Sequence, residues 1–189
     1  MIEHYIRGFE EDLREIRHQI HENPELGLQE FKTSALVAEK LRQWGYEVEQ
    51  GLATTGVVAT LKVGDGEKSI GLRADMDALP IYENSGKPWA SKHPGLMHAC
   101  GHDGHMANLL TFAQWLSEHR SQLKDDVVLL FQPAEETFEG ADNMIEHGIL
   151  ENPKPDAALA FHVTTGRSPV GTFMYNSKNT MMNSVDGFQ

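Results

Sequence analysis

A short stretch near the middle of the chain gathers many of the side chains that could do chemistry. Three histidines, the only cysteine and one aspartate fall within residues 98–105. Thiolate and imidazole are ligands that suit zinc and neighbouring transition metals. Cys100 and His102, separated by one glycine, can direct both side chains toward one point on a turn. The stretch predicts a metal site, with His98 and His105 as supporting or capping residues because a site needs only a few ligands.

Polar side chains also follow three of the strands that the sequence predicts. Asp75 and Asp77 follow the first of these strands, the adjacent Glu135 and Glu136 follow the second, and His162 follows the third. In open α/β sheets, ligands bind at the carboxyl ends of the strands. We therefore expect these residues to converge with the cysteine–histidine stretch in one crevice.

The carboxylates of Glu135 and Glu136 repel each other unless a cation or a proton separates them. One of the two could bind a metal while its neighbour moves protons, and the spacing leaves open which residue does which. This division suits metal-assisted hydrolysis, because binding to a metal lowers the pKa of water from roughly 16 to about 7. A nearby carboxylate then takes the proton from that water.

Other interpretations compete with a metal site. A lone cysteine is usually a small buried hydrophobe, and adjacent glutamates often belong to a solvated acidic loop. A cysteine-nucleophile enzyme would pair the Cys100 thiolate with His102 or His105, but it leaves the glutamate pair and His162 without roles. The combination of these residues favours the metal site.

The apolar pattern predicts the elements that must position these side chains. Helices are expected over residues 6–20, 31–44, 103–120 and 139–147, and strands over residues 56–63, 69–74, 127–131 and 157–161. The last two strands are continuous apolar runs, which is typical of strands buried on both faces. Their alternation with helices implies an α/β layer fold around a largely parallel sheet. The helix beginning near Asp103 would place its positive end beside Cys100 and lower the pKa of that thiol.

The composition excludes several classes of protein. The chain has 189 residues, with 16 basic against 28 acidic side chains and a net charge of −12. This balance argues against nucleic acid and anionic membrane surfaces as partners. One cysteine excludes an intrachain disulfide and fits a reducing cytosol. The N-terminus lacks the apolar segment of a signal peptide, and the longest aliphatic runs are too short to cross a bilayer, so we expect a cytoplasmic protein.

Four motifs resemble those of the metal-dependent amidohydrolases, which include hippurate hydrolases, auxin-conjugate hydrolases and N-acetyl-diaminopimelate deacetylases. The motifs are HENPELG at 21–27, RADMDALP at 73–80, MHACGHDGH at 97–105 and FQPAEE at 131–136. The resemblance implies a zinc-aminopeptidase-like catalytic domain, which is a three-layer α/β sandwich around a mostly parallel sheet. It also implies two divalent ions per complete site, with zinc, manganese, cobalt or nickel as candidates.

The resemblance assigns roles by position. The metal ligands would be Cys100, His102, Glu136 and His162. Glu135 would be the general base and then the proton shuttle to the leaving amine. Asp75 would orient a ligand histidine or otherwise tune the site. The implied reaction is hydrolysis of the amide bond of small N-acyl amino acids, of the hippurate or N-acetyl type.

Members of this family are longer, and a satellite domain that commonly mediates dimerisation interrupts their catalytic domain. Residues 1–175 would be the N-terminal part of the catalytic domain, and residues 176–189 would begin, or lead to, the satellite domain. The truncated chain would lack a further ligand histidine and the dimer surface, and it would have little activity.

Two other functions stay open at this point. The chain could be a non-catalytic metal-binding or interaction module, because its site is incomplete. It could also be a dipeptidase or carboxypeptidase on the same metal core. Cys100 leans away from the peptidases, since those relatives tend to place an aspartate at this position.

Overall fold

The computed structural model describes residues 7–63, 67–151, 154–166 and 168–175. Its strands are β1 (Glu47–Leu52), β2 (Gly56–Leu61), β3 (Ser69–Asp75), β4 (Asp126–Gln132) and β5 (Ala157–Ala160). Its helices are α2 (Glu10–His21), α3 (Phe31–Gln43), α4 (His102–Glu118) and α5 (Gly140–Glu146), with a 3-10 turn η1 (Arg120–Gln122). The predicted elements are present, with ends that differ by a few residues. Residue 6, the predicted start of the first helix, lies outside the described residues.

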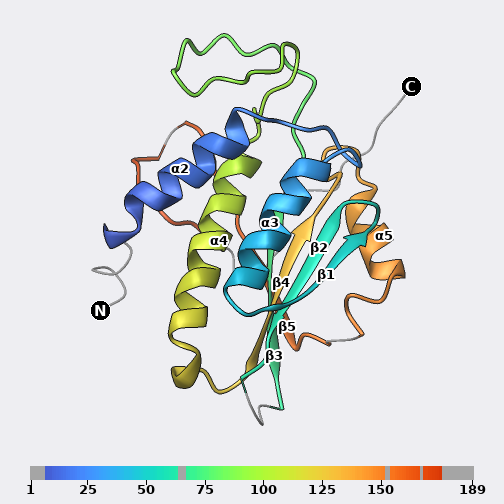
Figure 1. Ribbon diagram of the computed structural model, residues 1–189. Coiled ribbons are helices and arrows are strands. Elements are labelled where there is room, and N and C mark those ends of the chain that lie inside the picture. Colours follow the sequence, from blue (N-terminus) through green and yellow to red (C-terminus); the bar gives the residue numbers. More distant parts are fainter. Residues whose placement is uncertain (1–6, 64–66, 152–153, 167, 176–189) are drawn as a thin grey trace.

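The strands form one mixed sheet in the order β1-β2-β4-β3-β5. β3 runs parallel to both β4 and β5, whereas β2 runs antiparallel to β4 and β1 antiparallel to β2. All the strands except β2 therefore point in the same direction. α2, α3 and α4 lie on one side of the sheet and α5 on the other (Figure 1). This arrangement confirms the predicted α/β sandwich of three layers.

The two edge strands differ from what the sequence predicts. β1 was not predicted, because its residues are mostly polar and only Leu52 is buried. β5 was expected to be buried on both faces, and this was wrong, since all four of its residues are exposed. Leu159 on β5 is 60% exposed. The reason is that β5 pairs only with β3, and no other described strand lies beyond it.

The core lies between the sheet and the helices α2, α3 and α4. Phe131 and Leu129 on β4 are fully buried, as are Met106 and Leu110 on α4. Burying each such side chain stabilises the fold by about 1.5–3 kcal/mol. β4 and α4 are therefore rigid supports for the polar residues at their ends. Among the described residues, no helix has the length and apolar character needed to cross a bilayer.

The connection between β3 and α4, residues 76–101, extends past the end of the sheet (Figure 1). An isolated antiparallel bridge between Leu79 and Met97 ties its two arms together. A second bridge pairs Ala78 with Leu26, in the segment between α2 and α3. The connection therefore returns to its starting point, so that the residues before α4 lie next to the end of β3.

Tyr46 offers a direct test of this packing. Its side chain is buried, and its hydroxyl donates a 2.8 Å hydrogen bond to the Ala113 carbonyl on α4. Tyr46→Phe should lower the free energy of unfolding by about 1–2 kcal/mol, because a buried carbonyl loses its donor. Tyr82→Phe is the matched control, since Tyr82 is 74% exposed and should give no measurable change. Urea unfolding followed by circular dichroism measures both, and equal losses would contradict this packing.

Candidate metal centre

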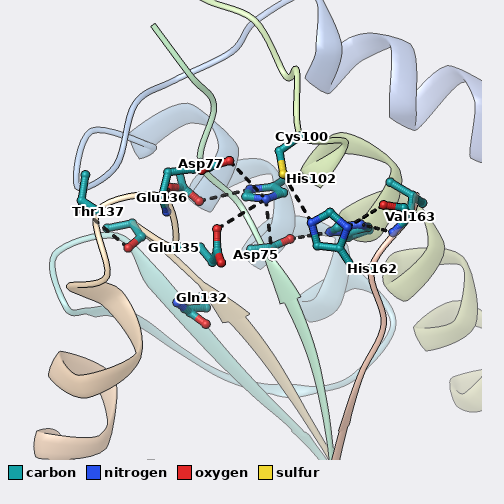
Figure 2. Close-up of polar contacts among 12 residues, drawn as sticks. Asp75, Asp77, Cys100, His102, Gln132, Glu135, Glu136, Thr137, His162 and Val163 are labelled. Atoms are coloured by element: carbon teal, nitrogen blue, oxygen red, sulfur yellow. Dashed lines mark hydrogen bonds and ion pairs between the residues drawn. The ribbon is translucent and has the colours of Figure 1, made fainter. Parts of the chain in front are cut away.

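The carboxyl ends of β3, β4 and β5 meet the start of α4 at one edge of the sheet (Figure 2). Acidic residues follow β3 and β4, a histidine follows β5, and a cysteine and a histidine come from the start of α4. Six of the residues singled out from the sequence gather there, namely Asp75, Cys100, His102, Glu135, Glu136 and His162. The expected convergence at the strand ends is thus what the structure has.

Gly101 allows Cys100 and His102 to flank the start of α4. It caps the helix with φ at +90°, a conformation that residues with a Cβ rarely adopt. A Cβ at this position would also lie 2.5 Å from Cγ2 of Val163, the residue after His162. Only glycine satisfies both conditions, so Gly101 brings the start of α4 against the segment that carries His162.

His102 is the central residue of the cluster. It is fully buried, and its Nδ1 lies 3.2 Å from Asp77 Oδ1. Its Nε2 lies 3.6 Å from Asp75 Oδ2, 3.8 Å from a Glu135 oxygen and 3.7 Å from Glu136 Oε1. His102 Nε2 and Glu136 Oε1 are both buried and make no hydrogen bond among the described residues. A nitrogen and carboxylate oxygens held at these separations leave room for a shared cation between them.

Two sets of possible ligand atoms overlap at His102. Cys100, His102 and His162 form one set, and His102, Glu135 and Glu136 form the other. Within each set, the ligand atoms lie within 4.8 Å of one another. Cys100 Sγ and His162 Nε2 are 3.3 Å apart. Sulfur, imidazole and carboxylate donors together fit a borderline divalent cation such as zinc, and they also accept manganese, cobalt or nickel.

A third set contains Asp75, His102 and His105, but His105 is already engaged. Its Nε2 accepts a 2.9 Å hydrogen bond from the Val163 N–H. Its Nδ1 lies 2.6 Å from Asp75 Oδ1, to which a neutral ring must therefore donate. With both ring nitrogens used, His105 connects the end of β3 to the residue after His162. This matches the supporting role expected for His105.

Asp77 has a positioning role that was not predicted from the sequence. Its Oδ1 faces His102 Nδ1, and its Oδ2 accepts a 2.9 Å hydrogen bond from the Glu136 N–H. Asp77 therefore fixes the His102 ring and the Glu136 backbone together. The sequence did contain an indication of this role, because Asp77 lies two residues after Asp75 and side chains two residues apart point to the same side of an extended chain.

The acidic surroundings reverse one expectation about Cys100. Burial, followed by the negative charges of Glu136, Glu135 and Asp75, raises the pKa of the Cys100 thiol to about 12. The positive end of α4 was expected to lower this pKa, and that expectation was wrong because burial and the converging carboxylates together outweigh the helix. A cation beside the sulfur would offset the negative charge of these carboxylates and so favour the thiolate form of Cys100, which is the form that binds a metal.

The pKa values of two carboxylates in the cluster, Asp75 and Glu135, shift in opposite directions. Burial would raise the pKa of Asp75, but the His105 hydrogen bond and the charges of Arg73 and His102 lower it to about 2. Arg73 Nη1 lies 2.7 Å from Asp75 Oδ2. Burial raises the pKa of Glu135, and the nearby charges of Asp75 and Glu136 add to this effect. Glu135 therefore holds a proton more readily than an ordinary glutamate.

His98 lies outside the cluster, although it comes from the same stretch of sequence. It is buried, its ring centroid is 6.3 Å from that of His21, and its nitrogens make no hydrogen bond among the described residues. Burial lowers the pKa of His98 to about 4. His98 belongs to none of the ligand sets among the described residues, and its supporting or capping role stays a prediction.

Comparison with known proteins gives consistent matches. The family model described as Peptidase family M20/M25/M40 matches residues 71–180. The chain is 46% identical over 179 residues to a Campylobacter jejuni protein named hippurate hydrolase, and the aligned region covers 94% of this chain and 45% of the relative. It is 41% identical over 187 residues to a Saccharolobus solfataricus protein named thermostable carboxypeptidase 2, and the aligned region covers 97% of this chain and 47% of the relative.

A solved structure from Bacillus subtilis, described as a dinuclear metal binding peptidase from the M20 family, has the same fold. Its TM-score is 0.79 at 38% sequence identity, covering 84% of this chain and 44% of the other. The chain therefore spans somewhat less than half the length of the relatives that it matches.

The cluster predicts metal binding that depends on His102 and Cys100. Titration of the chain with zinc, followed by calorimetry, should show binding that the double variant Cys100→Ser, His102→Ala loses. Asp77→Asn should weaken binding about 10- to 100-fold, because it disturbs the ring that presents Nε2. His147→Gln is the control, since this exposed histidine follows α5 and belongs to none of the ligand sets among the described residues. Equal binding by all four proteins would refute the site.

Proposed function

Because the chain belongs to peptidase family M20/M25/M40, we propose that it forms the metal-binding part of a hydrolase that cleaves the amide bond of N-acyl amino acids. The family match confirms the resemblance noted in the sequence. The observation that carries the proposal is the buried Nε2 of His102, which faces carboxylate oxygens of Asp75, Glu135 and Glu136 at 3.6–3.8 Å. Such a group of donors suits a divalent cation and a mobile proton at the same point.

The residues of the cluster divide into ligands and a proton carrier. Cys100, His102, Glu136 and His162 would hold the metal, which we propose to be two ions in the complete protein. When bound, such an ion lowers the pKa of water and polarises the amide carbonyl. The Glu135 side chain is 34% exposed and that of Glu136 is 23% exposed, so Glu135 is the more accessible of the two carboxylates to a substrate.

Glu135 would move one proton in two steps. It takes the proton from the attacking water as the bond from oxygen to the amide carbon forms. It then gives that proton to the amide nitrogen as the C–N bond breaks, so that a carboxylic acid and a free amino acid result. The raised pKa of Glu135 favours this exchange, since a carrier must both accept and release the proton.

The remaining polar residues position this group. Asp77 holds His102 and the Glu136 backbone, and His105 joins Asp75 to Val163. Asp75 also pairs with Arg73, whose other nitrogens donate to Gln132 at the end of β4. Asp75 would act through His102 and His105, as expected from the sequence for a supporting acid.

We also propose a cytoplasmic location and a homodimer of the whole protein.

Carboxypeptidase activity is the second candidate. The chain is 41% identical to a relative named thermostable carboxypeptidase 2. Both reactions break an amide bond to an amino acid, and they differ in what lies on the acyl side of that bond. A non-catalytic metal-binding module is the third candidate, and the absence of any turnover would favour it.

Substitution of Glu135 tests the proton carrier. In the full-length gene product, Glu135→Gln should reduce kcat for N-benzoylglycine about 10²- to 10⁴-fold, because the amide cannot accept a proton. Metal content, measured by elemental analysis, should stay unchanged because Glu136 is intact. Glu146→Gln removes an exposed acid from nearby α5 and should leave kcat unaltered. A Glu135→Gln enzyme with normal kcat would exclude the assigned role.

A substrate panel separates the candidates. Full-length protein is given N-acetyl and N-benzoyl amino acids, dipeptides, and peptides with a free C-terminus, and the release of amino acid is measured. We expect kcat/KM to be at least tenfold higher for the N-acyl amino acids. The opposite order would support the carboxypeptidase. The 189-residue chain, assayed alongside, should show little turnover, since the family resemblance places a further ligand histidine outside it.

A further inference from the structure

Glu135 and Glu136 sit on a loop with an unusual backbone. Ala134, which precedes them, has φ at +48°, in the left-handed region that residues other than glycine seldom occupy. This backbone conformation sets the directions in which the next two side chains leave the chain. Such a conformation persists only where surrounding contacts determine it.

A buried carboxylate 104 residues earlier in the chain makes one of these contacts. Glu30 is 0% exposed, and its Oε1 accepts a 2.9 Å hydrogen bond from the Ala134 N–H. Its Oε2 accepts a 2.6 Å hydrogen bond from the Thr55 hydroxyl, in the turn between β1 and β2. Glu30 has no ion-pair partner among the described residues, and the nearby charge is that of Asp77. A buried acid without a cation is costly, so its place beside this loop points to a use there.

Two glycines close the space around the same loop. A Cβ on Gly27 would lie 3.0 Å from Ala134 Cα and Cβ. Gly140, at the start of α5, donates its N–H to the Ala134 carbonyl at 3.2 Å, and a Cβ there would lie 1.6 Å from the Pro133 carbonyl oxygen. Ala134 is therefore held by Glu30 at its N–H and by Gly140 at its carbonyl.

The segment that carries Glu30 also touches the other acidic stretch. The Glu25 carbonyl accepts a 2.8 Å hydrogen bond from the N–H of Ala78, the residue after Asp77. The Glu25 carboxylate accepts a 2.8 Å hydrogen bond from the Thr33 N–H in the first turn of α3. This explains part of the HENPELG motif, to which the proposed reaction gives no role. The segment joins the residues after β3 to the residues after β4.

We infer that Glu30 is a positioning residue, whose buried carboxylate holds Ala134 in its left-handed conformation and so aims Glu135 and Glu136 at the site. Its effect on turnover rests on the proposed function. Its effect on metal binding does not, because Glu136 belongs to a ligand set whatever the reaction.

Three substitutions separate positioning from plain stability. Glu30→Ala leaves the N–H of Ala134 without an acceptor. Glu30→Gln keeps an oxygen for that N–H and turns its amide group toward the Thr55 oxygen, so this variant should keep the metal affinity and turnover that Glu30→Ala loses. Thr55→Val is the matched control, because it removes the other hydrogen bond of the same carboxylate and leaves the Ala134 contact intact.

The first readout is cobalt binding by the 189-residue chain, followed by its visible absorption. Glu30→Ala should weaken cobalt affinity roughly tenfold or more and alter the absorption bands, because Glu136 is displaced. Glu30→Gln and Thr55→Val should keep the affinity and the bands of the unmodified chain. If Glu30→Ala does not fold, Glu30→Asp replaces it, since it keeps the charge but shortens the reach to Ala134.

The second readout is hydrolysis of N-benzoylglycine by the full-length protein. Glu30→Ala should lower kcat roughly tenfold or more with little change in KM, whereas Thr55→Val should keep kcat despite a similar loss of melting temperature. The inference is overturned if Glu30→Ala, or Glu30→Asp in its place, binds cobalt as the unmodified chain does. It is also overturned if Thr55→Val loses as much affinity as Glu30→Ala. An unmodified full-length protein that hydrolyses no amide refutes the proposed function alone, because the cobalt readout still decides the role of Glu30.

Discussion

The contact between His102 and Asp77 is the one on which the rest of the centre depends. Because Asp77 faces Nδ1, the neutral His102 ring presents the lone pair of Nε2 to the carboxylates at the ends of β3 and β4. Although burial opposes it, the hydrogen bond to Asp77 and the charges of Asp75, Asp77 and Glu136 raise the pKa of His102, so that a proton and a cation compete for Nε2. Asp77 also holds the Glu136 backbone, and a single side chain thus sets the spacing between two donors.

Charge explains why so many acids tolerate one another in a buried place. The excess of acidic residues in the chain does not lie only on its surface, since several carboxylates converge where the strands end. Arg73 offsets Asp75, and the Cys100 thiol is kept neutral by its surroundings. These adjustments are partial, because His102 Nε2 and a Glu136 oxygen keep no partner among the described residues. A positive ion is the group that would satisfy them together.

The sequence predicts the architecture well wherever an element crosses the core. The apolar runs of β4 and the stripe of α4 leave little choice, and the residues that follow the strands meet because parallel strands end at the same edge. Prediction fails at the edges, where β1 has no apolar alternation and the apolar residues of β5 are exposed. It also fails for contacts across the chain, since no local pattern links Glu30 to Ala134 or Asp77 to His102. The thiol of Cys100 was misjudged because a helix end is visible in sequence, whereas distant carboxylates are not. The proposed division of the chain at residue 176 lies outside the described residues and stays a prediction.

Gly101 shows how a position without chemistry can restrict the evolution of a site. The hydrogen atom of its Cα occupies the narrow gap between the start of α4 and Val163. Substitution of Gly101 by any larger residue would push the segments that carry His102 and His162 apart. Sequence variation that alters the metal centre without breaking it would therefore occur at other positions around it. Changes of specificity in such a protein would therefore be sought in the surrounding loops, where side chains can be exchanged without moving the backbone that sets the donors.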